Sequence, residues 1–227
     1  SSVLGLGGAG GNDFGVILED AYKQSEFHLL CECASAQVVI DVMKRLAVLK
    51  ALQNAMTLKN SRGHSALTIA LLAGNSSVVL SLLQRAGNFC MKDLLKGMPN
   101  PVHFAVMGNS TECLSYVIKF IKAYCEGTAR PNVPIIRGSK PFSELIEWHD
   151  DNGLTPLALA CKLGYTEIVD ELIKGGANCA GTTSPTTASI TPLMIACTSG
   201  YVDIVQLLLV PLNSLPSPNS FIFSLGG

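Results

Sequence analysis

The residues of this chain that could ligate a metal or act as nucleophiles are its four histidines and eight cysteines. Cys31 and Cys33 form the closest cysteine pair, and their one-residue gap is too tight for a usual zinc knuckle. No cysteine–histidine pair, paired carboxylates or Gly-x-Ser-x-Gly turn can be assembled from the sequence. We therefore find no positive evidence of an enzyme, and we expect no catalytic residue, metal site or cofactor.

One glycine motif has the spacing of a nucleotide-binding loop. Gly5, Gly7 and Gly10, in "GLGGAGG", fit the G-x-G-x-x-G pattern that approaches the phosphates of a dinucleotide. Such a loop follows a strand and opens a helix, but only four residues precede Gly5 and no parallel-sheet pattern follows. We interpret residues 1–15 as a flexible glycine-rich segment, and a nucleotide-binding oxidoreductase stays a remote alternative.

Charge and cysteine content exclude further classes. Sixteen Lys and Arg residues nearly balance 17 Asp and Glu residues, so the chain lacks the basic footprint that binds a phosphate backbone. We therefore expect no nucleic-acid partner. Eight cysteines in 227 residues are too few for a disulfide scaffold. Free thiols suit a reducing compartment, so we expect an intracellular protein, in the cytoplasm first and the nucleus second.

The secondary structure that would position the histidines and cysteines can be predicted from a repeated sequence pattern. "TPLALACKLGY" begins at Thr155, and "TPLMIACTSGY" begins at Thr191. The same template fits three earlier positions, so each of five copies opens on a residue whose side chain can cap a helix: Ser25, Ser65, Asn100, Thr155 and Thr191. Nine residues later stand Ala34, Gly74, Asn109, Gly164 and Gly200, and Gly or Asn there suits the left-handed turn that ends a helix.

Apolar residues fill the space between these signals in every copy. A second apolar set follows with the spacing i, i+1, i+4, i+5, as in Ile168, Val169, Leu172 and Ile173, and draws one stripe along a second helix. Each repeat is predicted to be two short helices. A helix of about eight residues is unstable alone, so it must stack on a neighbour.

The segment "NGLTPLALACKLGYTEIVDELIKGGAN", from Asn152 to Asn178, resembles the ankyrin repeat, and Thr191 to Leu209 matches nearly as well. The three earlier copies keep fewer of the family's residues. The resemblance implies an all-α ankyrin-repeat solenoid of about five helix–turn–helix repeats with finger loops. The ankyrin-repeat domain is expected over residues 16–210, with repeats near 25–57, 58–90, 98–124, 151–180 and 189–210.

Two segments depart from the regular period. Residues 125–150 form an insertion with a short helix expected over Pro141 to Trp148. Such insertions can be functional, but we favour a loop packed by Phe142 and Trp148. Residues 211–227 are expected to form an irregular tail.

The stretch from Ala66 to Leu83 is 18 residues without a charge, which reaches the length of a membrane span. The break at Gly74–Ser77 falls where the repeat predicts a turn, so we expect no membrane insertion. The same turns hold two glycosylation motifs, at Asn75 and Asn109, which are therefore poor acceptors.

The repeat also assigns structural roles to polar residues. His28 and His103 occupy the histidine position of the family's T-P-L-H motif, where the ring bonds locally to the loop backbone. His64 and His149 lie in predicted fingers and are solitary. Cys31, Cys161 and Cys197 share one repeat position, which we interpret as a small core residue rather than a nucleophile.

What the resemblance implies about function is the binding of another protein on the concave side, formed by inner helices and finger loops. The predicted partner-binding residues are Leu72, Met107, Lys162, Tyr165 and Tyr201, with Asp150, Asp151 and Asn152 in one finger. Other finger residues are Asn60, Arg62 and His64. The alternative is a repeat domain that positions the substrate of a larger enzyme, channel or ubiquitin-ligase adaptor. Oligomeric state and partner identity are not encoded in any motif.

Overall fold

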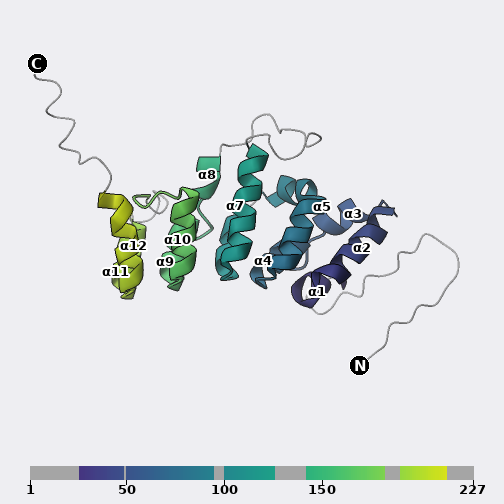
Figure 1. The fold of residues 1–227 in the computed structure, drawn as a ribbon, viewed down its shortest axis with the longest axis horizontal. Helices are drawn as coiled ribbons and strands as arrows, with labels where there is room; N and C mark the ends of the chain where they lie inside the picture. Colours follow the sequence, from purple (N-terminus) through teal and green to yellow (C-terminus); the bar gives the residue numbers. More distant parts are fainter. Residues whose placement is uncertain (1–25, 49, 95–99, 126–141, 182–189, 214–227) are drawn as a thin grey trace, which may run out of the picture.

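The computed structural model describes residues 26–48, 50–94, 100–125, 142–181 and 190–213. All regular elements in these ranges are helices, arranged as an elongated row from α1 and α2 at one end to α11 and α12 at the other (Figure 1). The helices are α1 (Glu26–Cys33), α2 (Ala36–Val48), α3 (Leu52–Thr57), α4 (Ala66–Leu72), α5 (Ser76–Leu94), α6 (Pro101–Met107), α7 (Thr111–Cys125), α8 (Phe142–Ile146), α9 (Pro156–Leu163), α10 (Thr166–Gly175), α11 (Pro192–Ser199) and α12 (Val202–Asn213). The expected all-α solenoid is confirmed.

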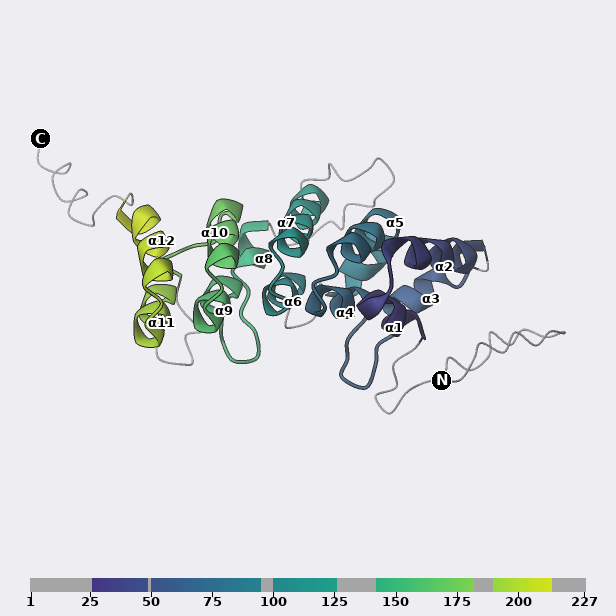
Figure 2. The same ribbon diagram turned by 60° about the horizontal axis from the view of Figure 1, so that its bottom comes forward.

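Ten of the helices in the described ranges form five hairpins, each made of one inner and one outer helix. Figure 2 shows the inner helices α1, α4, α6, α9 and α11 in one tier and the outer helices α2, α5, α7, α10 and α12 in the other. Each inner helix packs against the next inner helix, and successive outer helices also contact one another. The hairpins therefore stack by translation, as short helices that are unstable alone require.

The inner helices begin at the predicted capping residues. The side chains of Ser65, Thr155 and Thr191 each accept a hydrogen bond from the backbone amide three residues later. Asn100 accepts from the amides of Val102 and His103. Ser25 lies outside the described residues. These bonds satisfy amides that a helix start leaves without partners, so the cap prediction is confirmed at four positions.

The turns that end the inner helices also have the predicted conformation. The backbone φ angle is +65° at Gly74, +48° at Asn109, +75° at Gly164 and +77° at Gly200. The two glycosylation motifs therefore lie in the tight interhelical turns where the repeat places them. Asn75 also uses its side chain structurally, because its Nδ2 atom donates to the backbone oxygen of Ala34 over 3.1 Å.

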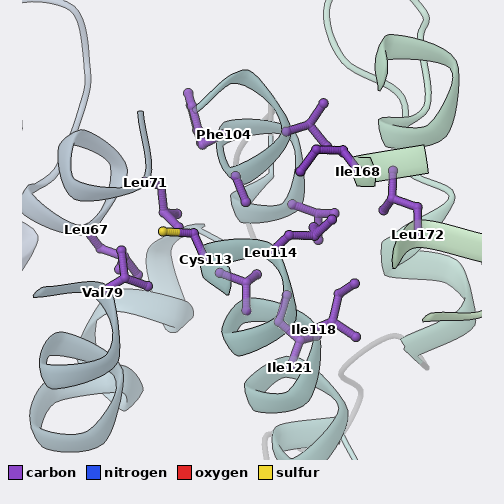
Figure 3. Close-up of a cluster of buried hydrophobic side chains, with 14 of the residues drawn as sticks. Leu67, Leu71, Val79, Phe104, Cys113, Leu114, Ile118, Ile121, Ile168 and Leu172 are labelled. Carbon is purple, nitrogen blue, oxygen red and sulfur yellow. The ribbon is translucent and has the colours of Figure 1, made fainter. Parts of the chain in front are cut away.

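Apolar side chains from successive hairpins form one continuous core. Figure 3 shows Leu67 and Leu71 from α4 beside Cys113 of α7, and Leu114 of α7 facing Ile168 of α10. Leu67, Leu71, Leu114 and Ile168 are fully buried. The core is thus a layer between the two tiers, and each repeat depends on its neighbours for burial.

The outer helices are longer than the short helices that the sequence predicts. The inner helices have seven or eight residues, whereas α5 has 19 and α7 has 15. The additional short helix α3 lies beside α2 and α5, and its Met56 is buried. The repeat template gave no signal for α3, because that helix precedes the finger, where the template assigns no position.

The described part of the insertion is built into the fold. Helix α8 (Phe142–Ile146) confirms the short helix expected over Pro141 to Trp148, and it ends at Ile146, before Trp148. Phe142 and Trp148 pack against the core as expected but stay partly exposed, whereas Leu145 and Ile146 are almost fully buried. The backbone oxygen of Leu145 also accepts a 2.7 Å hydrogen bond from Asn100 Nδ2. Residues 126–141 lie outside the described ranges.

The structure differs from the expected start of the C-terminal tail. Helix α12 continues through Pro211 to Asn213, so the first residues of the expected irregular tail are helical. The glycine-rich residues 1–15 and the rest of the tail lie outside the described ranges.

The uncharged stretch from Ala66 to Leu83 is split between α4 and α5 by a turn at residues 73–75. Among the described helices, none combines the length and apolar character that crossing a membrane requires.

Candidate functional site

One register position gives a row of side chains along the inner tier. The residue seven places after each capping position lies at or near the end of an inner helix: Glu32, Leu72, Met107, Lys162 and Thr198. We call these five residues the inner-face row. Leu72 is half-buried, and the other four are exposed. Successive inner helices are in contact, so the row crosses the stack from one end to the other.

Three of the predicted partner-binding residues, Leu72, Met107 and Lys162, belong to this row. Sequence reasoning did not select Glu32, although the same seven-residue spacing from Ser25 identifies it. The row is chemically mixed, with an acid at one end, two apolar side chains in the middle and a lysine beyond them. A partner would therefore meet different chemistry along the stack.

The two predicted tyrosines have partly structural roles. Tyr165 is half-buried against the core at the start of α10. Tyr201 is 38% exposed, and its ring lies on the preceding repeat. A Cβ atom added at Gly164 would come within 2.6 Å of the Tyr201 ring atom Cζ. Tyr201 therefore covers the turn that ends α9, and only part of the ring is left for a partner.

The finger that precedes α9 is organised by Asp150. Its Oδ1 atom accepts hydrogen bonds from the amides of Asn152 over 2.9 Å and Leu154 over 2.8 Å. The Asp150 amide in turn donates to the backbone oxygen of Leu154. Asp151 and Asn152 are exposed at the tip. Of the three predicted finger residues, Asp150 shapes the loop and the other two are open to a partner.

The finger that precedes α4 uses the same geometry with an asparagine. Asn60 Oδ1 accepts from the amides of Arg62 over 3.0 Å and His64 over 2.9 Å. Asn60 lies in the finger as predicted, but it is only 6% exposed and offers little surface to a partner. Its side-chain nitrogen is buried without a hydrogen-bond partner among the described residues, which is energetically unfavourable.

The histidines hold these fingers in place, as predicted. His28 Nε2 lies 3.1 Å from the backbone oxygen of Leu58. His103 Nε2 lies 3.0 Å from the backbone oxygen of Leu154, and its Nδ1 lies 2.9 Å from Asn100 Oδ1. Burial lowers the pKa of both imidazoles, which favours the neutral ring. Each ring thus ties an inner helix to the finger of the following repeat.

A hollow connects the inner-face row with the first finger. Its volume is about 230 Å³, and Glu32, Asn60, Arg62, His64, Ile69, Leu72 and Ala73 line it. Ile69, Leu72 and Ala73 supply apolar surface from α4 and its end, while Glu32 and Arg62 supply opposite charges. His64 packs edge-on against Phe104, with ring centroids 5.6 Å apart, and burial lowers its pKa. The hollow can receive an apolar side chain between polar flanks.

A second hollow of about 430 Å³ lies among α2, α3 and α5. Met43, Leu52 and Arg85 are among the residues that line it. It lies apart from the inner-face row and the fingers. Its residues form no group with a recognisable catalytic or metal-binding arrangement.

The cysteines at the shared repeat position differ in burial. Cys31 and Cys161 are fully buried, which confirms a core role for both. The same prediction for Cys197 is wrong, because Cys197 is exposed. Helix α11 packs on α9 and covers Cys161, whereas no described helix follows the α11–α12 hairpin. Burial raises the pKa of Cys161 to about 12, so its thiol stays protonated and is a poor nucleophile.

Within the described ranges, no group of three or more His, Cys, Asp or Glu side chains could hold a metal ion. The glycine motif at Gly5, Gly7 and Gly10 lies outside these ranges.

Stacked helical hairpins, finger loops before inner helices and a shared core layer define an α-helical repeat solenoid. The family model described as "Ankyrin repeats (3 copies)" matches residues 134–217. Residues 134–217 therefore carry ankyrin repeats.

Solved structures support this assignment at the level of the fold. The crystal structure of the human ASB11 ankyrin repeat domain is 21% identical with a TM-score of 0.53, over 83% of this chain and 69% of that one. The crystal structure of EF0377, an ankyrin repeat protein, is 17% identical with a TM-score of 0.60, over 87% of this chain and 85% of that one. No curated protein matches the chain.

Proposed function

We propose that this chain binds another protein through the inner-face row and the finger tips, as a non-catalytic interaction module. Ankyrin repeats generally mediate protein–protein interaction, and the chain carries this repeat. The observation that supports the proposed position is the continuous row from Glu32 to Thr198, with the fingers beside it. Concave, loop-lined surfaces on a stacked scaffold are suited to partner recognition.

The centre of this surface has suitable chemistry for an interface. Met107 is 37% exposed at the end of α6, and neighbouring Leu72 lines the hollow beside the first finger. Methionine adapts its shape to a partner, and apolar side chains surrounded by polar groups are typical of interface centres. We expect an apolar side chain of the partner to enter the hollow between Glu32 and Arg62.

The candidate catalytic groups are engaged in the fold, which supports a binding role over an enzymatic one. The rings of His28 and His103 bond to loop carbonyl oxygens, and the Cys161 thiol is buried and protonated. Their surroundings therefore support the repeat structure and leave these groups poorly placed to meet a substrate.

The test is affinity capture with the full chain and a Leu72→Glu/Met107→Glu variant. We expect the double variant to lose partners that the unchanged chain retains, because truncating or charging an interface centre weakens binding by about 2 kcal/mol or more, roughly 30-fold. The matched control is Lys119→Glu, which changes an exposed residue on the outer helix α7. Lys119→Glu should retain the same partners.

Tyr201 is a poor choice for this test, because its ring also covers the turn at Gly164. Circular dichroism melting of each variant checks that the fold is intact. If the double variant is folded and captures the same partners with unchanged affinity, the inner face is not the binding surface. A loss confined to Lys119→Glu would place binding on the outer tier.

A further inference from the structure

The fingers that precede α4 and α9 share one backbone hydrogen-bond pattern and differ in two side chains. Figure 2 shows both as loops that project in the same direction from the inner tier. Residues 60–64 align with residues 150–154, so Asn60 corresponds to Asp150 and Arg62 to Asn152. In both fingers the first side chain accepts, through Oδ1, from the amides two and four residues later. The fingers therefore differ in what the other polar atoms of these side chains meet.

The finger before α9 satisfies these atoms internally. Asp150 Oδ2 accepts from Asn152 Nδ2 over 3.3 Å, so an acceptor meets a donor. In the finger before α4 the same two positions both carry donors, because Asn60 has an NH2 group where Asp150 has an oxygen, and Arg62 replaces Asn152. Two donors cannot bond to each other, and Asn60 Nδ2 is buried with no partner among the described residues. The finger before α4 thus lacks an acceptor oxygen, and its absence is energetically costly.

The hollow beside this finger is where such an oxygen can enter. Asn60 and Arg62 line it on the finger side, and Leu72 and Ala73 line it at the end of α4. Asn60 Oδ1 is held by the finger amides, so Nδ2 is the polar atom that Asn60 has left for the hollow. Arg62 is exposed, so its side chain can move aside and admit a ligand atom to Nδ2. The hollow therefore combines a hydrogen-bond donor with an apolar wall.

The charges around the hollow favour a neutral acceptor over an acid. Exposed Glu32 lies on the α1 side and exposed Arg62 on the finger side, so the rim carries one charge of each sign. Burial lowers the pKa of His64, which favours its neutral ring. A carboxylate would be repelled by Glu32 as well as attracted by Arg62, whereas a peptide carbonyl is uncharged and accepts from an amide NH2 group.

We propose that the hollow binds an extended segment of the partner protein. A main-chain carbonyl oxygen of that segment accepts from Asn60 Nδ2, and the neighbouring apolar side chain lies on Leu72 and Ala73. This inference rests on the proposed function and adds the chemistry by which the partner is recognised at the first finger. The bond satisfies a donor that is already buried, so it favours binding more than a bond at the open surface does.

NMR spectroscopy of the isotopically labelled full chain tests this inference with a neutral probe, N-acetyl-leucine methylamide, which carries one apolar side chain between two peptide carbonyls. The side-chain NH2 signals of Asn60 are identified by their loss in Asn60→Asp. We expect the probe to move these signals with a dissociation constant on the order of 1 mM, as for a small fragment. N-acetyl-glycine methylamide, which lacks the apolar side chain, should bind about tenfold more weakly. N-acetyl-leucine, which ends in a carboxylate, should also bind more weakly than the neutral probe.

The matched variant is Asn60→Asp/Arg62→Asn, which gives this finger the two side chains of the other finger. It should fold as the unchanged chain does, because Asp150 and Asn152 already form such a finger, and circular dichroism checks this. The backbone amide signals of Leu72 should show that the variant binds the neutral probe about tenfold more weakly or less, because the donor is gone. Lys119→Glu, on the outer helix α7, should bind the probe as the unchanged chain does.

Four results would overturn the inference. One is an unchanged chain whose Asn60 side-chain signals do not move with the neutral probe. Another is equal affinity of this probe for the unchanged chain and the double variant. The third is tighter binding of N-acetyl-leucine, since the preferred acceptor would then be an acid. The fourth is a set of nuclear Overhauser contacts between the Asn60 NH2 group and residues 1–25, since the chain itself would then fill the hollow.

These results are separate from a failure of the proposed function. If one of them is found while Leu72→Glu/Met107→Glu still loses the captured partner, the inner face remains the binding surface and the recognition at the first finger is wrong. If the probe binds as expected while that variant keeps its partners with unchanged affinity, the partner does not use the hollow, and both proposals are wrong.

Discussion

The turn at Gly164 allows a sharp test of how one repeat depends on the next. Gly164 has a φ angle of +75°, and a Cβ atom there would come within 2.6 Å of the Tyr201 ring. Gly200, the equivalent residue of the next repeat, has a φ angle of +77°, and a Cβ atom there would meet nothing within 4 Å. The substitutions Gly164→Ala and Gly200→Ala therefore share the backbone strain and differ in the contact with Tyr201.

The size of each effect follows from these two terms. An alanine in the left-handed conformation costs about 1–2 kcal/mol, which is the whole effect expected for Gly200→Ala. The contact between Cβ and a packed ring adds about 1–3 kcal/mol, as overpacking usually does. Gly164→Ala should therefore lower the free energy of unfolding by about 2–5 kcal/mol, a large share of the stability of an ordinary domain.

Urea unfolding followed by circular dichroism measures both variants, alone and with Tyr201→Ala. Removing the ring should bring the effect of Gly164→Ala down to that of Gly200→Ala. The reasoning is refuted if the two glycine substitutions are equally destabilising while Tyr201 is present. It is also refuted if the Tyr201→Ala background leaves their difference unchanged.

Three further predictions concern buried polar groups. At pH 8, iodoacetamide should label exposed Cys197 in the folded chain and leave Cys161 unlabelled until urea is added, because burial raises the Cys161 pKa to about 12. Mass spectrometry of tryptic peptides measures the labelling of each cysteine. Labelling of Cys161 before urea is added would contradict its burial. Burial lowers the pKa of His103 below 6.5, so the imidazole takes up a proton more readily in the unfolded chain, and the free energy of unfolding should fall as pH drops below about 6.5. In urea titrations at pH 7 and pH 5, His103→Asn should lose less stability between the two pH values than the unchanged chain. An equal loss in both chains would contradict this. Asn60→Ala should destabilise the chain by about 1–3 kcal/mol, because the part-buried backbone amides of Arg62 and His64 lose their acceptor. Asn60→Asp, which copies Asp150, should retain near-normal stability in thermal melts. Equal losses would show that Asn60 Oδ1 does not organise the finger.

Local signals allowed most of the fold to be predicted. Capping residues such as Thr155 act on amides within the same turn, and Gly164 adopts a conformation that few other residues accept. The histidine role came from the repeated word, because the T-P-L-H position places the His103 ring beside the finger of the following repeat, at the Leu154 carbonyl. These features depend on a few neighbouring residues and on a repeated word, so one sequence is enough to find them.

The features that were not predicted depend on neighbours in space. Cys197 and Cys161 occupy the same position in nearly identical words, but Cys161 is buried in a hairpin on which α11 packs, whereas Cys197 is exposed. The hollow beside Leu72 combines α1, α4 and a finger, so no single repeat contains it. The burial of Asn60 likewise follows from how its finger folds back on the stack.

The central claim is that a protein partner lies across the inner tier. Site-specific photo-crosslinking tests it most directly, with benzoyl-phenylalanine placed at Met107 on the inner face or at Lys119 on the outer tier of the full chain, expressed in cells. We predict a covalent adduct with a partner protein from position 107 and none from position 119. Adducts from position 119 alone, or the same adducts from both positions, would contradict the claim.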